Sequence, residues 1–123
     1  MSNKMTPAWE QYINIKKDYA DVVLLFRMGD FYEAFDKDAH VLSEKLEITL
    51  TQKQFGKNQK HDLAGFPYHS LNQHLSTLLK KDVKVAICEQ TSEQTNIKGI
   101  IEREVVRVVS PGTIFEDYML DNQ

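Results

Sequence analysis

The stretch VVLLFRMGDFYEAF, from Val22 to Phe35, decides the fold. It begins with an uninterrupted apolar run, VVLLF, that ends at Phe26. A short run of this kind is typical of a strand covered on both faces, so it predicts a strand near the centre of a sheet. Gly29 then ends this strand and marks a turn.

The second half of the stretch predicts a helix. Asp30 and Glu33 have the spacing of an acidic capping box, which places the start of the helix at about Phe31. Apolar residues then recur at helical steps and would form the buried stripe of this helix. They are Ala34, Phe35, Ala39, Leu42 and Leu46.

Further elements flank this stretch. Thr6 and Pro7 predict an earlier helix, with Thr6 as its N-cap, and Ser70 is a candidate N-cap for a later helix. Strand patterns cover residues 47–51, 83–88 and 102–109. Residues 52–62 are predicted to form a mobile loop. The fold class is therefore α/β of the α+β type, with a mixed β-sheet flanked by about three helices.

The composition is that of one folded domain. The chain has 123 residues, of which 41% are hydrophobic and 27% are charged, and this suits a single globular core. The one cysteine, Cys88, allows no internal disulfide and suits a reducing compartment. No apolar run has the length of a signal peptide or a membrane span, so we expect neither secretion nor membrane insertion.

The overall charge is acidic. A net charge of -3 and a pI of about 5.8 are not typical of a free-standing, tight nucleic-acid binder. Any DNA affinity must therefore come from local basic patches. One candidate patch contains Lys53, Lys57, Lys60 and His61, and another contains Lys80, Lys81 and Lys84. Lysine runs are more often solvated faces than binding sites.

The sequence gives little support to catalysis. Four acidic residues could suggest a metal-dependent nuclease: Asp30, Glu33, Asp36 and Asp38. Their spacing resembles the acid-rich start of a helix more than a converging metal cluster. Cys88 forms no zinc-like pattern with the histidines, and neither a GxxxxGK[ST] phosphate loop nor a GxGxxG motif occurs. We therefore expect a binding module and not an enzyme.

The tripeptide from Phe31 to Glu33 allows two interpretations. An aromatic ring held at a rigid helix start could stack on a base or enter a minor groove, and unstacking costs least where base pairing is faulty. Alternatively, Phe31 joins the core beneath the helix and Glu33 only caps it. The tripeptide alone favours the second interpretation.

Several longer blocks resemble domain I of the MutS family of DNA mismatch-repair proteins. They are TPAWEQYINIK, LLFRMGDFYEAF, EITLT, LAGFPYHS, VAICEQ and EREVVRVVSPGT. Blocks in the family's order and spacing are far more specific than one short motif. The chain departs from the family pattern at Ile100, where proline is frequent, and at Leu63, where methionine is frequent.

The resemblance implies roles for individual residues. In the family, a Phe-x-Glu motif enters the DNA minor groove at a mismatch. Phe31 and Glu33 match this motif and would be the stacking wedge and the hydrogen-bond acceptor for a base. Further candidate contacts to the DNA backbone or groove are Arg103, Lys53, Lys57, Lys60 and Leu63.

The resemblance also implies a larger protein. Residues 1–113 would form the mismatch-recognition domain, and residues 114–123 would begin a linker to a further domain. The parent would bind ATP and magnesium elsewhere, form a homodimer or heterodimer and engage a MutL-type partner. It would act on double-stranded DNA with mismatches or small loops. A bacterial parent would lie in the cytoplasm near the nucleoid, and the sequence leaves a bacterial or an organellar parent open. One alternative is a protein-interaction domain with Phe31 and Tyr32 as a docking patch, and another is a degenerate nuclease.

Overall fold

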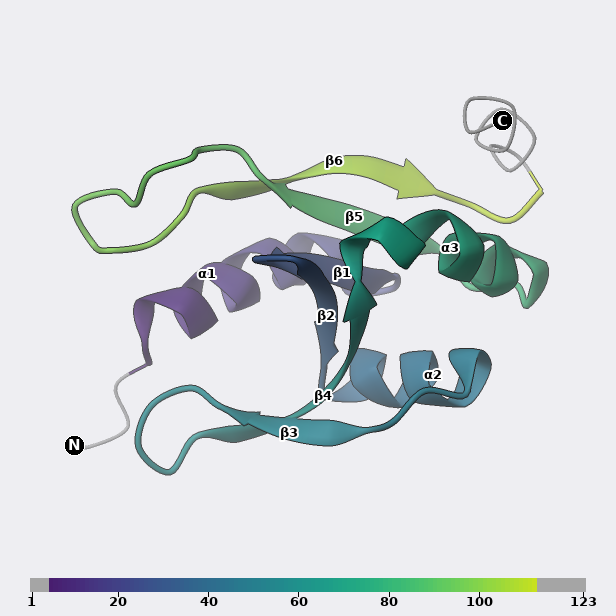
Figure 1. Ribbon diagram of the computed structural model, residues 1–123, viewed down its shortest axis with the longest axis horizontal. Coiled ribbons are helices and arrows are strands. Elements are labelled where there is room, and N and C mark those ends of the chain that lie inside the picture. The colour runs from purple at the N-terminus through teal and green to yellow at the C-terminus, as the bar shows by residue number, and fades with distance from the viewer. Residues whose placement is uncertain (1–4, 113–123) are drawn as a thin grey trace.

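The structure is a computed structural model that describes residues 5–112, so the segment predicted as a linker lies outside the described residues. Within the described part, six strands form one sheet in the order β3-β4-β2-β1-β5-β6 (Figure 1). The strands are β1 (Val23–Met28), β2 (Phe31–Phe35), β3 (Thr51–Gln54), β4 (Lys60–Pro67), β5 (Val85–Gln90) and β6 (Arg103–Val109). The α-helices are α1 (Pro7–Lys16), α2 (Lys37–Leu46) and α3 (Leu71–Lys80).

The sheet is mixed, as predicted. Strand β1 runs parallel to β5, and all other neighbouring strands are antiparallel. Because β1 has a partner on each side, the apolar run at its start is buried in the middle of the sheet. The mixed sheet and its three helices confirm the predicted fold class.

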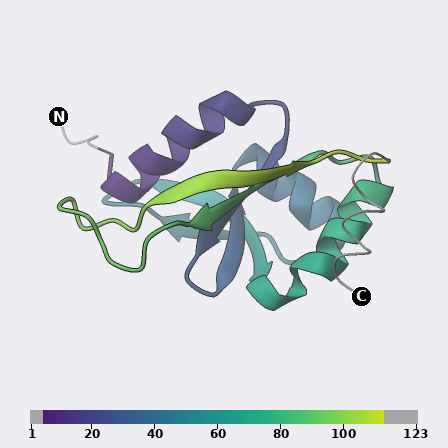
Figure 2. The same cartoon turned by 90° about the horizontal axis from the view of Figure 1, so that it is seen from above.

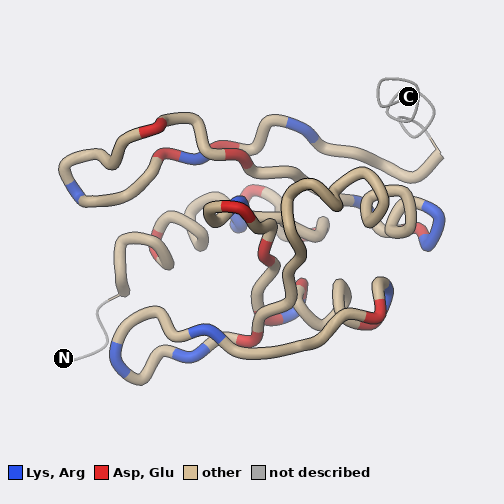
Figure 3. Tube along the Cα trace, viewed as in Figure 1, with Lys and Arg blue, Asp and Glu red and all other residues tan. Residues whose placement is uncertain are grey.

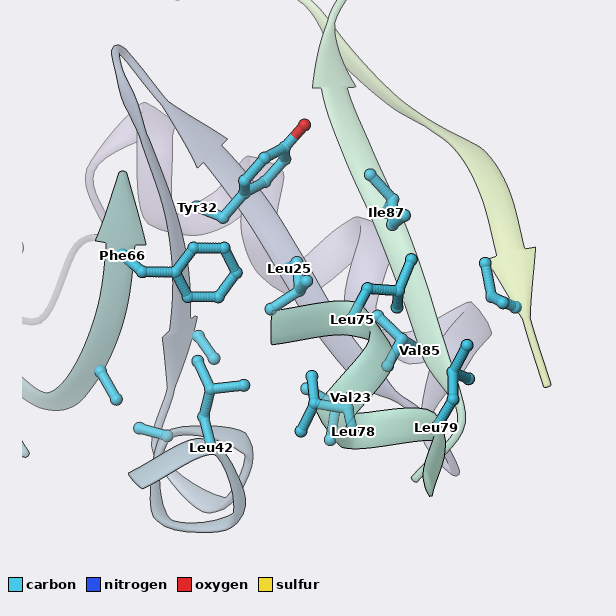
Figure 4. Close-up of a cluster of buried hydrophobic side chains, with 14 residues drawn as sticks. Val23, Leu25, Tyr32, Leu42, Phe66, Leu75, Leu78, Leu79, Val85 and Ile87 are labelled. Atoms are coloured by element: carbon cyan, nitrogen blue, oxygen red, sulfur yellow. The ribbon is translucent and has the colours of Figure 1, made fainter. Parts of the chain in front are cut away.

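Two cores lie on opposite faces of the sheet. Helices α2 and α3 cover one face and α1 covers the other (Figure 2). Successive residues of a strand point to opposite faces, so Val23 and Leu25 pack toward α2 and α3 (Figure 4), whereas Leu24 and Phe26 pack toward α1. The face toward α1 holds a mainly aromatic cluster.

The N-terminal helix begins as the sequence predicts. The Thr6 hydroxyl accepts a hydrogen bond from the Trp9 backbone N–H at 3.3 Å, and a proline occupies the first turn. The end of α1 is fixed by Lys16, whose Nζ lies 2.8 Å from the buried carboxylate of Asp38. The same carboxylate accepts a hydrogen bond from the Leu24 N–H at 3.1 Å, so it joins α1, α2 and β1. None of the described helices is long and apolar enough to cross a membrane.

The helix predicted to open at Phe31 is wrong. Residues Phe31–Phe35 form β2, a strand with hydrogen-bonded neighbours on both sides, and α2 begins only at Lys37. The spacing of Asp30 and Glu33 is therefore not a capping box. The helical stripe is correct farther along, because Ala39 and Leu42 are fully buried.

The mobile loop predicted for residues 52–62 is also wrong. Most of this segment belongs to the antiparallel hairpin of β3 and β4. Phe55 anchors the hairpin, since its ring is buried 4.9 Å from the Trp9 ring. The strand predicted for residues 47–51 overlaps β3 only at Thr51. Ser70 does precede α3, but its side chain makes no capping hydrogen bond.

Candidate functional site

Phe31 lies at the tip of the hairpin formed by β1 and β2. It pairs with Met28, and Gly29 takes the left-handed backbone conformation of the turn with φ of 61°. The Phe31 side chain is 44% exposed. Phe35, which lies on the same face of the same strand, is 1% exposed. Phe31 therefore does not join the core, and its ring is available for contact with another molecule.

Side chains on the opposite face of the sheet brace this tip. Arg27 donates from Nε to the Gly29 carbonyl at 2.6 Å and from a terminal nitrogen to Glu89 at 3.0 Å. The Tyr32 hydroxyl donates to the same Glu89 carboxylate, and the Arg27 guanidinium lies 4.4 Å from the centre of the Tyr68 ring. These contacts tie the turn before Phe31 to β5 and to the Tyr68 ring.

The same bracing fixes the environment of Tyr32. Burial, followed by the hydrogen bond to Glu89, raises the pKa of Tyr32 above its ordinary value, so its hydroxyl remains a donor near neutral pH. The residue is only 2% exposed. Tyr32 therefore does not share an exposed docking patch with Phe31, which removes the main feature of the alternative protein-interaction site.

Glu33 lies in the middle of β2, on the face toward α1. Its register partners are Phe26 on β1 and Gly65 on β4. A Cβ atom at Gly65 would lie 2.7 Å from the Tyr32 carbonyl oxygen and 3.2 Å from the Glu33 Cγ. Only glycine leaves room for the Glu33 side chain at this position. A glycine inside a strand often marks such a close approach, so the LAGFPYH block carried this signal in the sequence.

The carboxylate of Glu33 is paired. The Lys53 Nζ lies 3.1 Å from Glu33 Oε1, and the side chains of Lys53 and Glu33 are 32% and 14% exposed. The partner comes from β3, on the far side of β4, so the sheet brings together two residues that lie 20 positions apart.

The other predicted lysines lie on the same hairpin. Lys57 is exposed in the connection between β3 and β4, and exposed Lys60 begins β4. The basic positions of this hairpin stand out in Figure 3. Leu63 is half-buried and packs against the aromatic cluster under α1, opposite Phe35. Packing in the core therefore explains why an apolar residue stands at position 63, and no DNA contact is needed to explain it.

Arg103 starts β6 and ties three elements together. It donates from Nε to the Arg27 carbonyl at 2.7 Å and from a terminal nitrogen to the Gln11 side chain at 2.7 Å. Its guanidinium lies 4.9 Å from the centre of the Phe26 ring. Burial lowers the pKa of Arg103, and the negative charge of the Glu33 carboxylate partly opposes this shift. These contacts give Arg103 a bracing role next to the Phe31 hairpin.

The remaining candidate chemistry is not assembled into a site. In the part of the chain that the structure describes, no three His, Cys, Asp or Glu side chains gather in a way that could hold a metal ion. Cys88 is fully buried, and burial raises its pKa to about 12, so it carries no thiolate near neutral pH. The sequence does not single out Arg27 and Glu89, which support the tip, or Gly65, which leaves room for the Glu33 side chain.

An exposed aromatic ring on a braced hairpin, beside a paired carboxylate and a basic hairpin, defines a binding module on a mixed α/β scaffold. Residues 6–118 match the family model described as MutS domain I, and the chain belongs to this family. Three relatives, each named DNA mismatch repair protein MutS, show the extent of the similarity. They come from Dehalococcoides mccartyi (46% identical over 97% of the chain), Thermosipho melanesiensis (50% over 97%) and Oceanobacillus iheyensis (47% over 95%). The chain spans 14% of the length of each relative.

Proposed function

We propose that this chain is the mismatch-recognition domain of a larger DNA-repair protein, and that Phe31 and Glu33 read the faulty base pair from the minor groove. The observation that carries the proposal is the exposure of Phe31, 44%, at the end of a hairpin that Arg27 holds rigid. Family membership and the names of the relatives support the same function.

Phe31 acts as a wedge. A rigid apolar ring can enter the minor groove and separate two stacked base pairs, and this costs least where the pairing is already faulty. Stacking of an aromatic side chain on a base is typically worth about 1 to 3 kcal/mol. Because Phe31 is fixed on a strand and not on a mobile loop, little conformational entropy is lost when it inserts.

Glu33 supplies discrimination and not affinity. A carboxylate close to the phosphates of a duplex is repelled by them, so it weakens binding unless a base compensates. A displaced base offers a free N–H donor to the carboxylate, whereas a stacked and paired base does not. Glu33 lies two residues after Phe31 on the same face of β2, so the ring and the carboxylate approach the same groove.

The rest of the machinery lies in the larger protein. The chain's share of its relatives, 14%, supports a protein with several further domains. We assign to those domains the binding of ATP and magnesium, dimerisation and the contact with a MutL-type partner, and we place the protein in the bacterial cytoplasm near the nucleoid. In this domain, Lys53, Lys57 and Lys60 supply contacts to the DNA backbone, and Arg103 supports the groove-facing hairpin.

The test is a pair of dissociation constants for matched and mismatched duplexes, measured at one salt concentration with the full-length protein. Glu33→Gln should preserve or increase affinity for matched DNA and reduce the mismatched-to-matched ratio, which is the affinity for mismatched DNA divided by the affinity for matched DNA. Glu44→Gln, a matched change at an exposed position of α2, should leave both constants unchanged. A Glu33→Gln protein with an unchanged ratio and a lowered melting temperature would show that Glu33 has only a structural role.

A further inference from the structure

Lys53 and Glu33 form an ion pair within the surface that we assign to DNA. The ammonium and the carboxylate are 3.1 Å apart, and both side chains are mostly covered. The apolar surroundings include the Phe55 ring, whose centre lies 5.6 Å from the Lys53 Nζ. Gly65 lies opposite Glu33 and keeps the carboxylate close to the sheet. The two groups that would touch DNA are therefore bound to each other when DNA is absent.

This pairing limits what each residue can do. While Lys53 is bound to Glu33, its charge is already neutralised and it releases little counterion from a phosphate. While Glu33 is bound to Lys53, its carboxylate cannot accept a hydrogen bond from a base with full strength. Since a partly buried pair is screened less by salt than an exposed one, an incoming duplex must offer a better partner to both groups before they separate.

We propose that Lys53 determines specificity by exchanging partners: it stays on Glu33 in a complex with matched DNA and moves to a phosphate only when Glu33 binds a displaced base. The inference rests on the proposed function of Glu33 and adds Lys53 as the residue that restrains it. Matched DNA provides no donor for Glu33, so the ion pair remains. Mismatched DNA provides partners for both groups, so the mismatched complex gains a contact between Glu33 and a base and a contact between Lys53 and a phosphate.

The exchange predicts different salt dependences for the two complexes. The logarithm of the binding constant falls as the logarithm of the salt concentration rises. Each phosphate neutralised by a cationic side chain makes this line steeper by about 0.9. The mismatched complex of the unmodified protein should therefore have a slope steeper by about 0.9 than the matched complex, beyond any contacts that both share. The slopes are measured with one matched duplex and one G·T duplex of equal length, over roughly 50 to 200 mM salt, with the full-length protein.

Two substitutions separate the exchange from simpler roles. Lys53→Met should make the salt dependence of the mismatched complex shallower by about 0.9 and leave that of the matched complex unchanged. Lys53 contacts a phosphate only in the mismatched complex. Glu33→Gln should make the salt dependence of the matched complex steeper by about the same amount, because the substitution releases Lys53 to the phosphates in both complexes. Lys57→Met, on the same hairpin but in the exposed connection, should change both slopes alike.

Other outcomes overturn the exchange. If Lys53→Met makes the salt dependence of both complexes shallower by the same amount, Lys53 is an ordinary phosphate contact. If it changes neither, the ion pair is only structural. Melting curves show whether each variant is folded. If the unmodified protein prefers the mismatch but both complexes have equal slopes, the exchange fails and the proposed function stands. If it shows no preference for the mismatch, the proposed function itself fails.

Discussion

Phe31 and Phe35 occupy the two ends of one strand, on one face, yet their surroundings differ. Phe35 is surrounded by the rings of Trp9, Tyr12 and Phe55, with centres between 5.0 and 5.6 Å away. Phe31 lies beyond this cluster, and its ring is largely open to solvent. The difference shows that the exposure of an aromatic residue here depends on what covers the sheet at that point and not on the residue type.

The cover ends between the two positions. Helix α1 lies over this face of the sheet (Figure 2). Its Trp9 and Tyr12 rings pack against Phe35 at that end of β2. At the other end of the strand, bracing from the opposite face replaces cover, through Arg27 and Glu89. The protein thus supports the hairpin that carries Phe31 without burying the Phe31 ring.

The largest expected effect is at the buried end of the comparison. Phe35→Ala should destabilise the fold by about 3 to 5 kcal/mol, because it removes a fully buried ring and leaves a cavity in the aromatic cluster. Phe31→Ala should cost less than about 1 kcal/mol, because the ring is mostly exposed. Denaturant unfolding measures both values. Similar losses for the two variants would remove the distinction between the two ends.

Gly65→Ala tests the space reserved for Glu33. The new methyl group would meet the Tyr32 carbonyl oxygen at 2.7 Å, so we expect a loss of about 1 to 3 kcal/mol in unfolding free energy. It would also press on the Glu33 Cγ and lower the mismatched-to-matched ratio. Glu33→Ala in the same protein should recover only part of the stability, since the contact with the carbonyl remains. A Gly65→Ala protein with normal stability would show that the close approach is not restrictive.

His74 provides a smaller effect, confined to the core on the far side of the sheet. It lies against the Phe66 ring, with centres 4.5 Å apart, and burial lowers its pKa from the ordinary value of 6.5. The unfolded chain therefore binds the proton more readily, so stability is retained above pH 6.5 and decreases as the pH falls toward the lower pKa of the folded state.

His74→Leu is the matched variant for this pH dependence. It should flatten the loss of unfolding free energy between pH 7 and pH 5 and leave the mismatched-to-matched ratio at pH 7 unchanged. Unfolding curves over this range provide the measurement. An equally steep decrease in the variant would assign the pH dependence to other groups.

The sequence predicts the fold best where local signals agree with the tertiary structure. The central strand, the start of α1 and the buried stripe of α2 are all confirmed because apolar periodicity and capping residues act locally. The segment Phe31–Phe35 was predicted as a helix because Asp30 and Glu33 mimic a cap. The ladders to β1 and β4 outweigh that local preference, and no local pattern shows them.

The candidate site was predictable only in part. The Phe-x-Glu spacing places Phe31 and Glu33 by resemblance, but the residues that control them come from distant segments. Lys53 reaches Glu33 across β4, and Glu89 reaches Arg27 from β5. Such pairings depend on strand order, which a single sequence does not specify. The sequence predicts a loop in place of the β3–β4 hairpin, because the mostly polar strand β3 at the sheet edge lacks the apolar alternation of a covered strand.

The most direct test of the account is the effect of Phe31→Ala on mismatch preference, measured together with its unfolding free energy. The full-length protein is titrated with matched and G·T duplexes at one salt concentration, and Val106→Ala, at another exposed apolar position, is the control. We predict that Phe31→Ala removes most of the mismatched-to-matched ratio, a loss of about 1 to 3 kcal/mol in discrimination, while the melting curve changes little. The control should change neither quantity. A Phe31→Ala protein that keeps its mismatch preference, or that loses it only because the domain unfolds, would contradict the account.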